Sequence, residues 1–163
     1  MVRCSCGQVE IQALGEPIYS LVCYCDDCQK GAEAVEVLTG ARPVREADGG
    51  TPYSLYRKDR VKIVRGREFI KPYKVRGESP TRRNVATCCN SAVILDFDNW
   101  QPWVSLYHTA LVGRQRPPIQ MRIFTKYAPS PDAIPKDIPA YRTFPLTFPL
   151  RMLPLIALIK LGL

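Results

Sequence analysis

The sequence predicts a mainly β domain that ends in a short helix, and three observations favour this fold class. Short runs that alternate polar and apolar residues, such as Gln8–Ala13, are typical of strands with one buried face. Fifteen prolines among 163 residues disfavour long helices, because proline removes a backbone donor and interrupts the helical ladder. Seven cysteines lie in small groups beside these runs. A chain of this length is long enough to build one hydrophobic core.

The N-terminal half is expected to alternate strands with turns. A single helical turn is expected at Gln29–Glu33, with Asp26 and Asp27 at its N-terminus, where acidic side chains favour the helix dipole. Glycine and proline residues predict a loop over Thr39–Thr51. The expected strands of this half are Gln8–Ala13, Ile18–Val22, Ala34–Leu38 and Val61–Val64.

The C-terminal half is expected to hold the most regular strand, Ala92–Phe97. Pro72 predicts a hairpin over residues 69–75 at a sheet edge, because proline cannot donate to a central ladder. Two further strands are expected at Val104–Tyr107 and Met121–Phe124. We expect residues 1–127 to form the β domain, and residues 128–163 to form a proline-rich linker and an apolar helix packed on it.

The apolar helix is expected over Leu150–Leu161, with Pro149 at its start. Its apolar run is far shorter than the ~20 residues that a transmembrane helix needs. We expect it to pack on the domain or on a second copy of the chain, which would make the protein a homo-oligomer. Contact with a membrane surface is the alternative. Met1–Cys4 begins no apolar signal segment, so we expect a cytoplasmic protein.

Three cysteines within six residues, Cys23, Cys25 and Cys28, have a spacing that fits one tetrahedral metal ion. Such a spacing is typical of zinc, and no fourth ligand follows within the next twenty residues. The group could therefore keep an open position for water or a substrate. A zinc ion with three thiolates carries a charge of −3 + 2 = −1, which suits binding of an incoming thiol better than activation of water.

The remaining cysteines form two pairs, Cys4 with Cys6 and Cys88 with Cys89, and neither pair has a local partner. We expect the pairs to meet across the sheet and hold a second zinc ion. Two zinc ions on seven thiolates would add −7 + 4 = −3 to the formal net charge of +8, leaving about +5.

The order of these three groups resembles the glutathione-dependent formaldehyde-activating enzyme family, to which centromere protein V also belongs. The resemblance covers roughly residues 1–97, and its motifs are Cys4-Ser5-Cys6-Gly7, Cys23-Tyr24-Cys25-Asp26-Asp27-Cys28-Gln29 and Cys88-Cys89-Asn90-Ser91. It implies an Mss-four-like fold of packed antiparallel sheets with zinc knuckles. It also implies a structural zinc at Cys4, Cys6 and the knuckle near residue 89, and a catalytic zinc at Cys23, Cys25 and Cys28. The implied activity is condensation of glutathione with formaldehyde, a carbon–sulfur lyase reaction in reverse.

The chain departs from the family pattern at the late knuckle. Ala86 stands where a first cysteine is usual, and Asn90 replaces a glycine, a mild change because asparagine tolerates positive φ. Cys88 could take the place of the missing ligand, although two adjacent ligands need a distorted backbone. Cys88 could also stay free, join the Cys23 group and close it, or form a strained disulfide with Cys89.

Three residues are candidates for binding the co-substrate glutathione. Arg57 and Lys58 could pair with its carboxylates, and Tyr24 could donate a hydrogen bond to a bound ligand. Each also has a purely structural interpretation, because Tyr24 fits a packed aromatic residue and the basic run fits a solvated strand face. The three-cysteine group could likewise hold a purely structural zinc.

Three hypotheses about function follow. The first is a zinc-dependent lyase-like enzyme that joins glutathione with formaldehyde or a similar small electrophile. The second is a non-catalytic, zinc-stabilised module that binds nucleic acid or a protein. Nucleic acid is disfavoured, because aromatic residues are only 9% of the chain and acidic residues are scattered among the basic ones. The third is a silent zinc protein that acts through its apolar tail.

Overall fold

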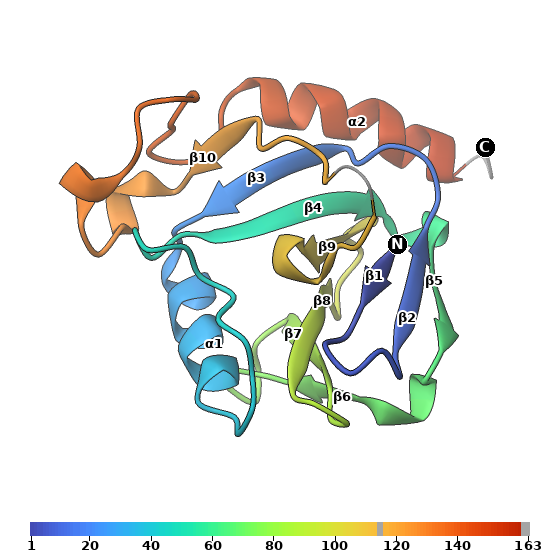
Figure 1. Cartoon of the computed structure of the whole chain (residues 1–163). Coiled ribbons are helices and arrows are strands. Elements are labelled where there is room, and N and C mark those ends of the chain that lie inside the picture. Colours follow the sequence, from blue (N-terminus) through green and yellow to red (C-terminus); the bar gives the residue numbers. More distant parts are fainter. Residues whose placement is uncertain (114–115, 161–163) are drawn as a thin grey trace.

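The computed structural model describes residues 1–113 and 116–160, which fold into two sheets and two α-helices (Figure 1). This confirms the mainly β prediction with a C-terminal helix. The strands are β1 (Val2–Arg3), β2 (Glu10–Ala13), β3 (Tyr19–Cys23), β4 (Thr51–Arg57), β5 (Val61–Arg65), β6 (Ile70–Tyr73), β7 (Thr81–Ala86), β8 (Ser91–Phe97), β9 (Trp103–Tyr107) and β10 (Met121–Ile123). The helices are α1 (Asp26–Glu36) and α2 (Thr147–Lys160).

The larger sheet has the strand order β10-β3-β4-β9-β8-β7-β6, and the smaller one has the order β1-β2-β5. Neighbouring strands are antiparallel except for β10, which pairs parallel to β3. The expected purely antiparallel sheets are therefore corrected at this edge. A parallel neighbour requires a long crossover, and the connection from β9 to β10 supplies it.

The core lies on both faces of the central strands. Every residue of β3 is buried, because α2 lies along one face of this strand and the rest of the β structure covers the other (Figure 1). Phe148 of α2 stacks on Tyr19 of β3 with ring centroids 5.4 Å apart, and Met152, one turn later, is also buried. The apolar end of the chain is thus part of the core. No helix among the described residues is long and apolar enough to span a bilayer.

One predicted strand, Ala34–Leu38, is wrong. Helix α1 continues through Glu36, because its buried positions have a helical rather than an alternating period. These positions are Cys28, Gly31, Ala32 and Val35. Asp26 and Asp27 occupy the first turn, as predicted from the helix dipole.

The other differences concern strands that were not predicted and the limits of predicted elements. Strands β1, β4 and β7 were not predicted. The edge position of Pro72 was predicted correctly, since β6 is the last strand of its sheet. Its hairpin partner is β7 rather than the residues immediately after Pro72. Helix α2 begins at Thr147, includes Pro154, and is described to Lys160. The predicted end at Leu161 lies outside the described residues.

Candidate active site and metal centres

The three cysteines Cys23, Cys25 and Cys28 come together where β3 ends and α1 begins. Cys23 is the last residue of β3, Cys25 is the N-cap of α1, and Cys28 lies in its first turn. Their sulfur atoms all lie within 4.8 Å of one another. We call this set the three-thiol cluster. Among the described residues, no His, Asp, Glu or further Cys joins it.

The environment of the three-thiol cluster divides its members by acidity. The pKa of Cys25 lies well below its ordinary value, because the thiols of Cys23 and Cys28 and the backbone N–H groups of Cys28 and Asp27 donate hydrogen bonds to it. The pKa of Cys23 is raised by the hydrogen bonds with Cys25 and Cys28 and by burial. Cys25 is therefore the thiol that ionises first, and it lies at a helix N-terminus that favours negative charge.

A cavity of about 880 Å³ opens onto this cluster, and all three cysteines line it together with Asp27. The rest of its wall comes from β3, β4, β8, β9 and β10, from the loop 76–81, from Gln101 and Phe124, and from Phe144 and Phe148 near the C-terminus. Its volume falls in the range of sites that enclose a small organic molecule. A thiol or carbonyl compound inside this cavity would thus lie beside three cysteine sulfurs.

A buried arginine that sequence analysis did not identify binds Asp27, the residue next to Cys28. Arg83 of β7 is 1% exposed, and its guanidinium donates a hydrogen bond of 2.8 Å to the carboxylate of Asp27 and another to the Asp27 carbonyl. The pKa of Cys28 is raised overall, but the hydrogen bond with Cys23 and the positive charge of Arg83 both act to lower it. A positive charge is therefore fixed next to a group of potential thiolates. No local pattern marks Arg83, because its partner lies 56 positions earlier in the chain.

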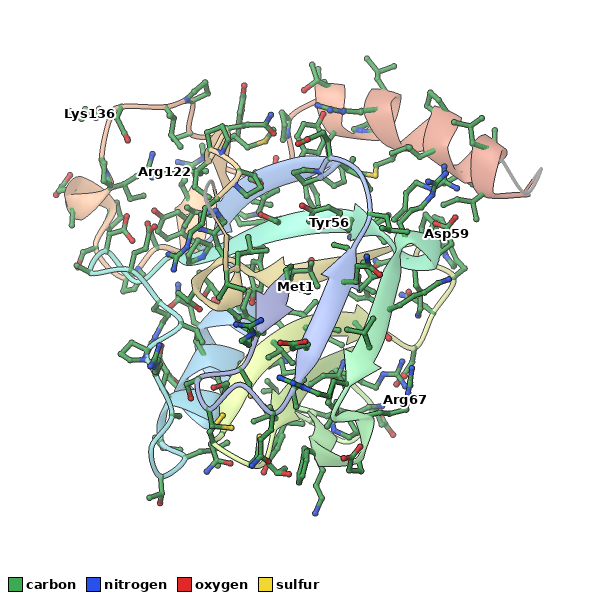
Figure 2. All side chains as sticks on the ribbon, turned by 45° about the vertical axis from the view of Figure 1, so that its right-hand side comes forward. Met1, Tyr56, Asp59, Arg67, Arg122 and Lys136 are labelled. Carbon is green, nitrogen blue, oxygen red and sulfur yellow. The ribbon has the colours of Figure 1, made fainter. Side chains whose placement is uncertain are left out.

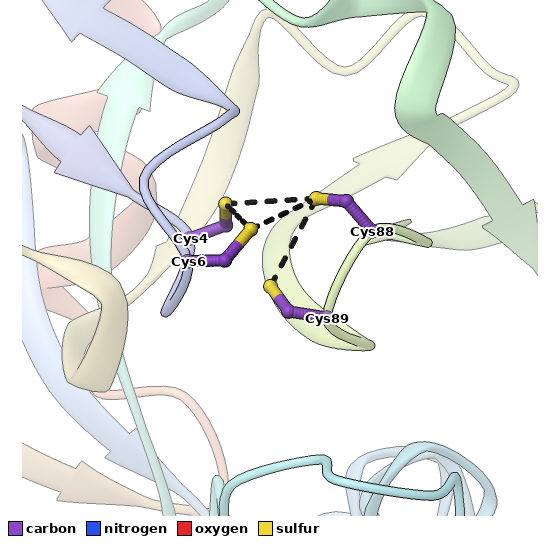
Figure 3. Close-up of side chains that lie close together, drawn as sticks. All are labelled: Cys4, Cys6, Cys88 and Cys89. Atoms are coloured by element: carbon purple, nitrogen blue, oxygen red, sulfur yellow. Dashed lines mark hydrogen bonds between the residues drawn. The ribbon is translucent and has the colours of Figure 1, made fainter.

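The second cysteine group joins the N-terminus to the turn between β7 and β8. The sulfurs of Cys4, Cys6 and Cys88 point toward one another, and Cys89 lies beside them (Figure 3). The sulfur separations are 3.5 Å for Cys4–Cys6, 3.8 Å for Cys4–Cys88, 3.3 Å for Cys6–Cys88 and 3.9 Å for Cys88–Cys89. Four sulfurs at about 2.3 Å from a central ion form a tetrahedron with edges of about 3.8 Å. This four-thiol cluster therefore has the size of a closed tetrahedral site.

This geometry decides among the alternatives left open for Cys88. Cys88 and Cys89 are both free thiols, so the vicinal disulfide is excluded, and Cys88 belongs to the four-thiol cluster rather than to the three-thiol cluster. Asn90, which replaces the glycine of the family pattern, has a left-handed φ of 52°, a conformation that asparagine tolerates. Ala86 is fully buried and packs in the core.

The three residues predicted to bind glutathione do not line the cavity. Tyr24 is fully buried, and its hydroxyl donates a 2.7 Å hydrogen bond to Asp48. Arg57 and Lys58 form ion pairs with Asp59 and Asp96. Their assignment as ligand-binding residues stays a prediction that this placement does not favour.

Arg57 does not line the cavity at the cysteines because it lies at the other end of its strand. Thr51 at the start of β4 pairs with Cys23, whereas Arg57 is the last residue of the same strand. Six residues of β-strand span about 20 Å. Figure 2 shows Asp59 and Arg122 at opposite ends of these strands. Asp59 is the ion-pair partner of Arg57, and Arg122 of β10 pairs with Val22 of β3, next to Cys23.

Comparison with known proteins identifies one family. The family model described as glutathione-dependent formaldehyde-activating enzyme matches residues 1–127. Among curated proteins, none matches this chain. Among solved structures, the crystal structure of a Rhodobacter sphaeroides protein is similar at 19% sequence identity, with a TM-score of 0.49. The similarity covers 70% of this chain and 89% of that one.

Proposed function

The chain belongs to the glutathione-dependent formaldehyde-activating enzyme family, and from this membership we propose that it joins a thiol to the carbonyl carbon of an aldehyde. The thiol is that of glutathione, and the reaction is the reverse of a carbon–sulfur lyase reaction. The observation that carries the proposal is the cavity, which is lined by all three cysteines of the three-thiol cluster and by none of the four-thiol cluster. This difference supports a chemical role for the three-thiol cluster and a structural role for the four-thiol cluster.

The donor sets support zinc at both clusters. Thiolates are soft ligands that select zinc over hard cations, and the four sulfurs already have the spacing of a tetrahedral zinc site. Cys23, Cys25 and Cys28 would hold the second ion with three ligands, as in sites that keep one position for a substrate. A zinc ion held there would supply the positive centre that keeps an incoming thiol in its thiolate form.

The proposed reaction is an addition to the carbonyl group, and it needs a group that transfers one proton. The sulfur of glutathione attacks the carbonyl carbon, a C–S bond forms, and the π electrons of the C=O bond move to the oxygen. That oxygen takes up a proton in place of the one lost by the thiol, which gives a hemithioacetal without any oxidation. Asp27 is the carboxylate that lines the cavity beside the cluster, and Arg83 fixes its orientation. We assign Asp27 to the transfer of this proton.

The alternative of a binding module for nucleic acid receives little support from the charged residues near β8. Lys58 and Arg82 both pair with Asp96, and Lys74 and Arg82 pair with Asp98. These acidic partners break up what would otherwise be a continuous basic face, which nucleic-acid binding requires.

Two measurements test the proposed function. Zinc content of the purified protein is expected to be two ions per chain, and one per chain in the Cys25→Ser variant. Exchange between free formaldehyde and its glutathione adduct, followed by NMR at equilibrium, is expected to be faster with the wild-type protein than with Cys25→Ser. Equal exchange rates for the two proteins, both at the uncatalysed value, would exclude the enzymatic role.

A further inference from the structure

Five aromatic rings form one wall of the cavity beside the three-thiol cluster. Phe124 contacts Phe144 with ring centroids 4.7 Å apart, and Phe144 stacks on Phe148 at 4.2 Å. Phe148 meets Trp103 edge to face at 6.1 Å, and Trp103 meets Phe97 at the same distance. All five line the cavity, and we call them the aromatic wall. An unbroken row of rings offers contact to an apolar or aromatic group along its whole length.

Two members of the aromatic wall come from outside the family match. The match ends at residue 127, whereas Phe144 precedes α2 and Phe148 lies in its first turn. Phe148 is 6% exposed and is fixed by Tyr19, but Phe144 is 43% exposed and closes the wall from the solvent side. The C-terminal segment of this chain thus shapes the cavity that the family domain provides.

The backbone of Phe124, one member of the aromatic wall, has an unfavourable conformation. Phe124 follows β10 and has a φ of 59°, in the left-handed region that bulky residues rarely adopt. Such conformations are unfavourable for bulky residues and tend to occur at binding and catalytic sites. Here the left-handed turn places the ring of Phe124 against Phe144, inside the cavity.

The described lining residues of the cavity are mainly apolar and include few charged groups. Arg76 is the only Lys or Arg among the described lining residues, and it is accompanied by the acids Asp27 and Glu78. Formaldehyde has no apolar body that could use the aromatic wall. For the two carboxylates of glutathione, the described lining residues offer one cationic group, Arg76 of the polar loop 76–81.

We propose that the carbonyl substrate is an aldehyde with an aromatic or long aliphatic body, which lies against the aromatic wall while glutathione extends toward the loop 76–81. This inference rests on the proposed function, because the aldehyde carbon must reach the thiol at the three-thiol cluster. The step is the addition described above: the C–S bond forms, the C=O π bond opens, and the thiol proton passes to oxygen. The product is a hemithioacetal that carries the apolar group.

The test separates binding from turnover by using stable thioethers. S-benzylglutathione and S-methylglutathione share the tripeptide and differ only in the group that would meet the aromatic wall. We expect the zinc-loaded protein to bind S-benzylglutathione at least tenfold more tightly, measured by titration calorimetry. In Phe144→Ala this preference is expected to fall by about 2- to 10-fold, the effect of one lost aromatic contact.

Two further variants serve as controls. Leu146→Ala lies in the same segment but is 88% exposed and does not line the cavity, so it should keep the preference. Phe144→Leu, which keeps an apolar side chain, should retain part of it. Equal affinities for the two thioethers, or no binding of either, would overturn the inference, even if formaldehyde exchange were accelerated. A benzyl preference in a protein that accelerates no hemithioacetal formation would overturn the proposed function but support the ligand class of the cavity.

Discussion

The guanidinium group of Arg83 fills the space in which a side chain on Gly31 would lie. A Cβ atom built on Gly31 would overlap with the Nε and Cζ atoms of Arg83. Helix α1 therefore packs against β7 through a glycine–arginine contact (Figure 1). The same guanidinium reaches Asp27 in the first turn of the helix, next to Cys28. The orientation of the three-thiol cluster thus depends on a close approach that only glycine permits.

The first prediction follows from this contact. Gly31→Ala should destabilise the protein by about 2 kcal/mol or more, because a displaced Arg83 leaves a buried charge without its partner. In an unconstrained helix the same substitution would stabilise by up to about 1 kcal/mol. Gly77→Ala is the matched control, since a Cβ there meets nothing within 4 Å. Urea unfolding of both variants checks the prediction, and a gain in stability for Gly31→Ala would refute it.

The second prediction concerns the charge of Arg83. Arg83→Met should weaken zinc binding at the three-thiol cluster by about 10- to 100-fold, as is usual for a lost outer partner of metal ligands. The four-thiol cluster should keep its ion, so competition with a chelator should release one zinc earlier than in wild type. Arg82→Met removes a neighbouring cation that is half-buried and pairs with Asp96 and Asp98. If Arg82→Met released zinc as early as Arg83→Met, the effect would come from the loss of any nearby positive charge and not from the position of Arg83.

The sequence allowed the two cysteine groups to be predicted because their spacing is local for Cys23, Cys25 and Cys28, and because the remaining four cysteines had few alternative partners. The strand predicted at Ala34–Leu38 was wrong. Val35, Val37 and Leu38 have the composition of a strand, but the buried residues from Cys28 to Val35 recur with the period of a helix.

Arg83 and the aromatic wall could not be predicted from local patterns. Asp27 and Arg83 are 56 residues apart, and the wall combines Phe97, Trp103 and Phe124 with residues of the tail. Such sets of residues can be predicted only when the strand order is known, because β7, β9 and β10 are distributed across the whole larger sheet. The tail was expected to pack on the domain, but its part in the cavity depends on the ring contacts of Phe144 and Phe148.

The third prediction separates the tasks of the two clusters. Cys6→Ser should lower the free energy of unfolding by about 3 kcal/mol or more, because the four-thiol cluster ties β1 to the turn after β7 and metal binding contributes to folding. For a domain of this size, that corresponds to a fall in Tm of about 6–12 °C. Cys25→Ser should change Tm much less, since serine is also a good N-cap for α1.

Zinc content and adduct exchange complete this comparison. Each of the two variants is expected to hold one zinc ion, but only Cys25→Ser should lose the acceleration of adduct exchange. If Cys6→Ser abolished exchange while keeping a folded structure and the zinc of the three-thiol cluster, the separation of structural and chemical tasks would be wrong.

The fourth prediction concerns the loop that follows α1. Both carboxylate oxygens of Glu36 accept hydrogen bonds: Oε1 from the backbone N–H groups of Val44 and Arg45, and Oε2 from the Arg45 guanidinium. Burial of Glu36 opposes its ionisation, but these bonds outweigh the burial and hold the pKa below its ordinary value of 4.5. Glu36→Gln should therefore lower the stability at pH 7 by about 1 kcal/mol, a value reduced by solvent screening.

The sign of the pH dependence follows from the lowered pKa. A carboxyl group with a depressed pKa in the folded state stabilises fully above its unfolded pKa, and this stabilisation is lost as the pH falls through the folded value. The stability difference between wild type and Glu36→Gln should thus be largest at neutral pH and shrink below about pH 4.5. Glu33→Gln is the control, because Glu33 is 61% exposed and only approaches the same Arg45 at 3.5 Å. Urea unfolding at a series of pH values measures the difference, and a gap that widens in acid would show that Glu36 does not anchor the loop in its ionised form.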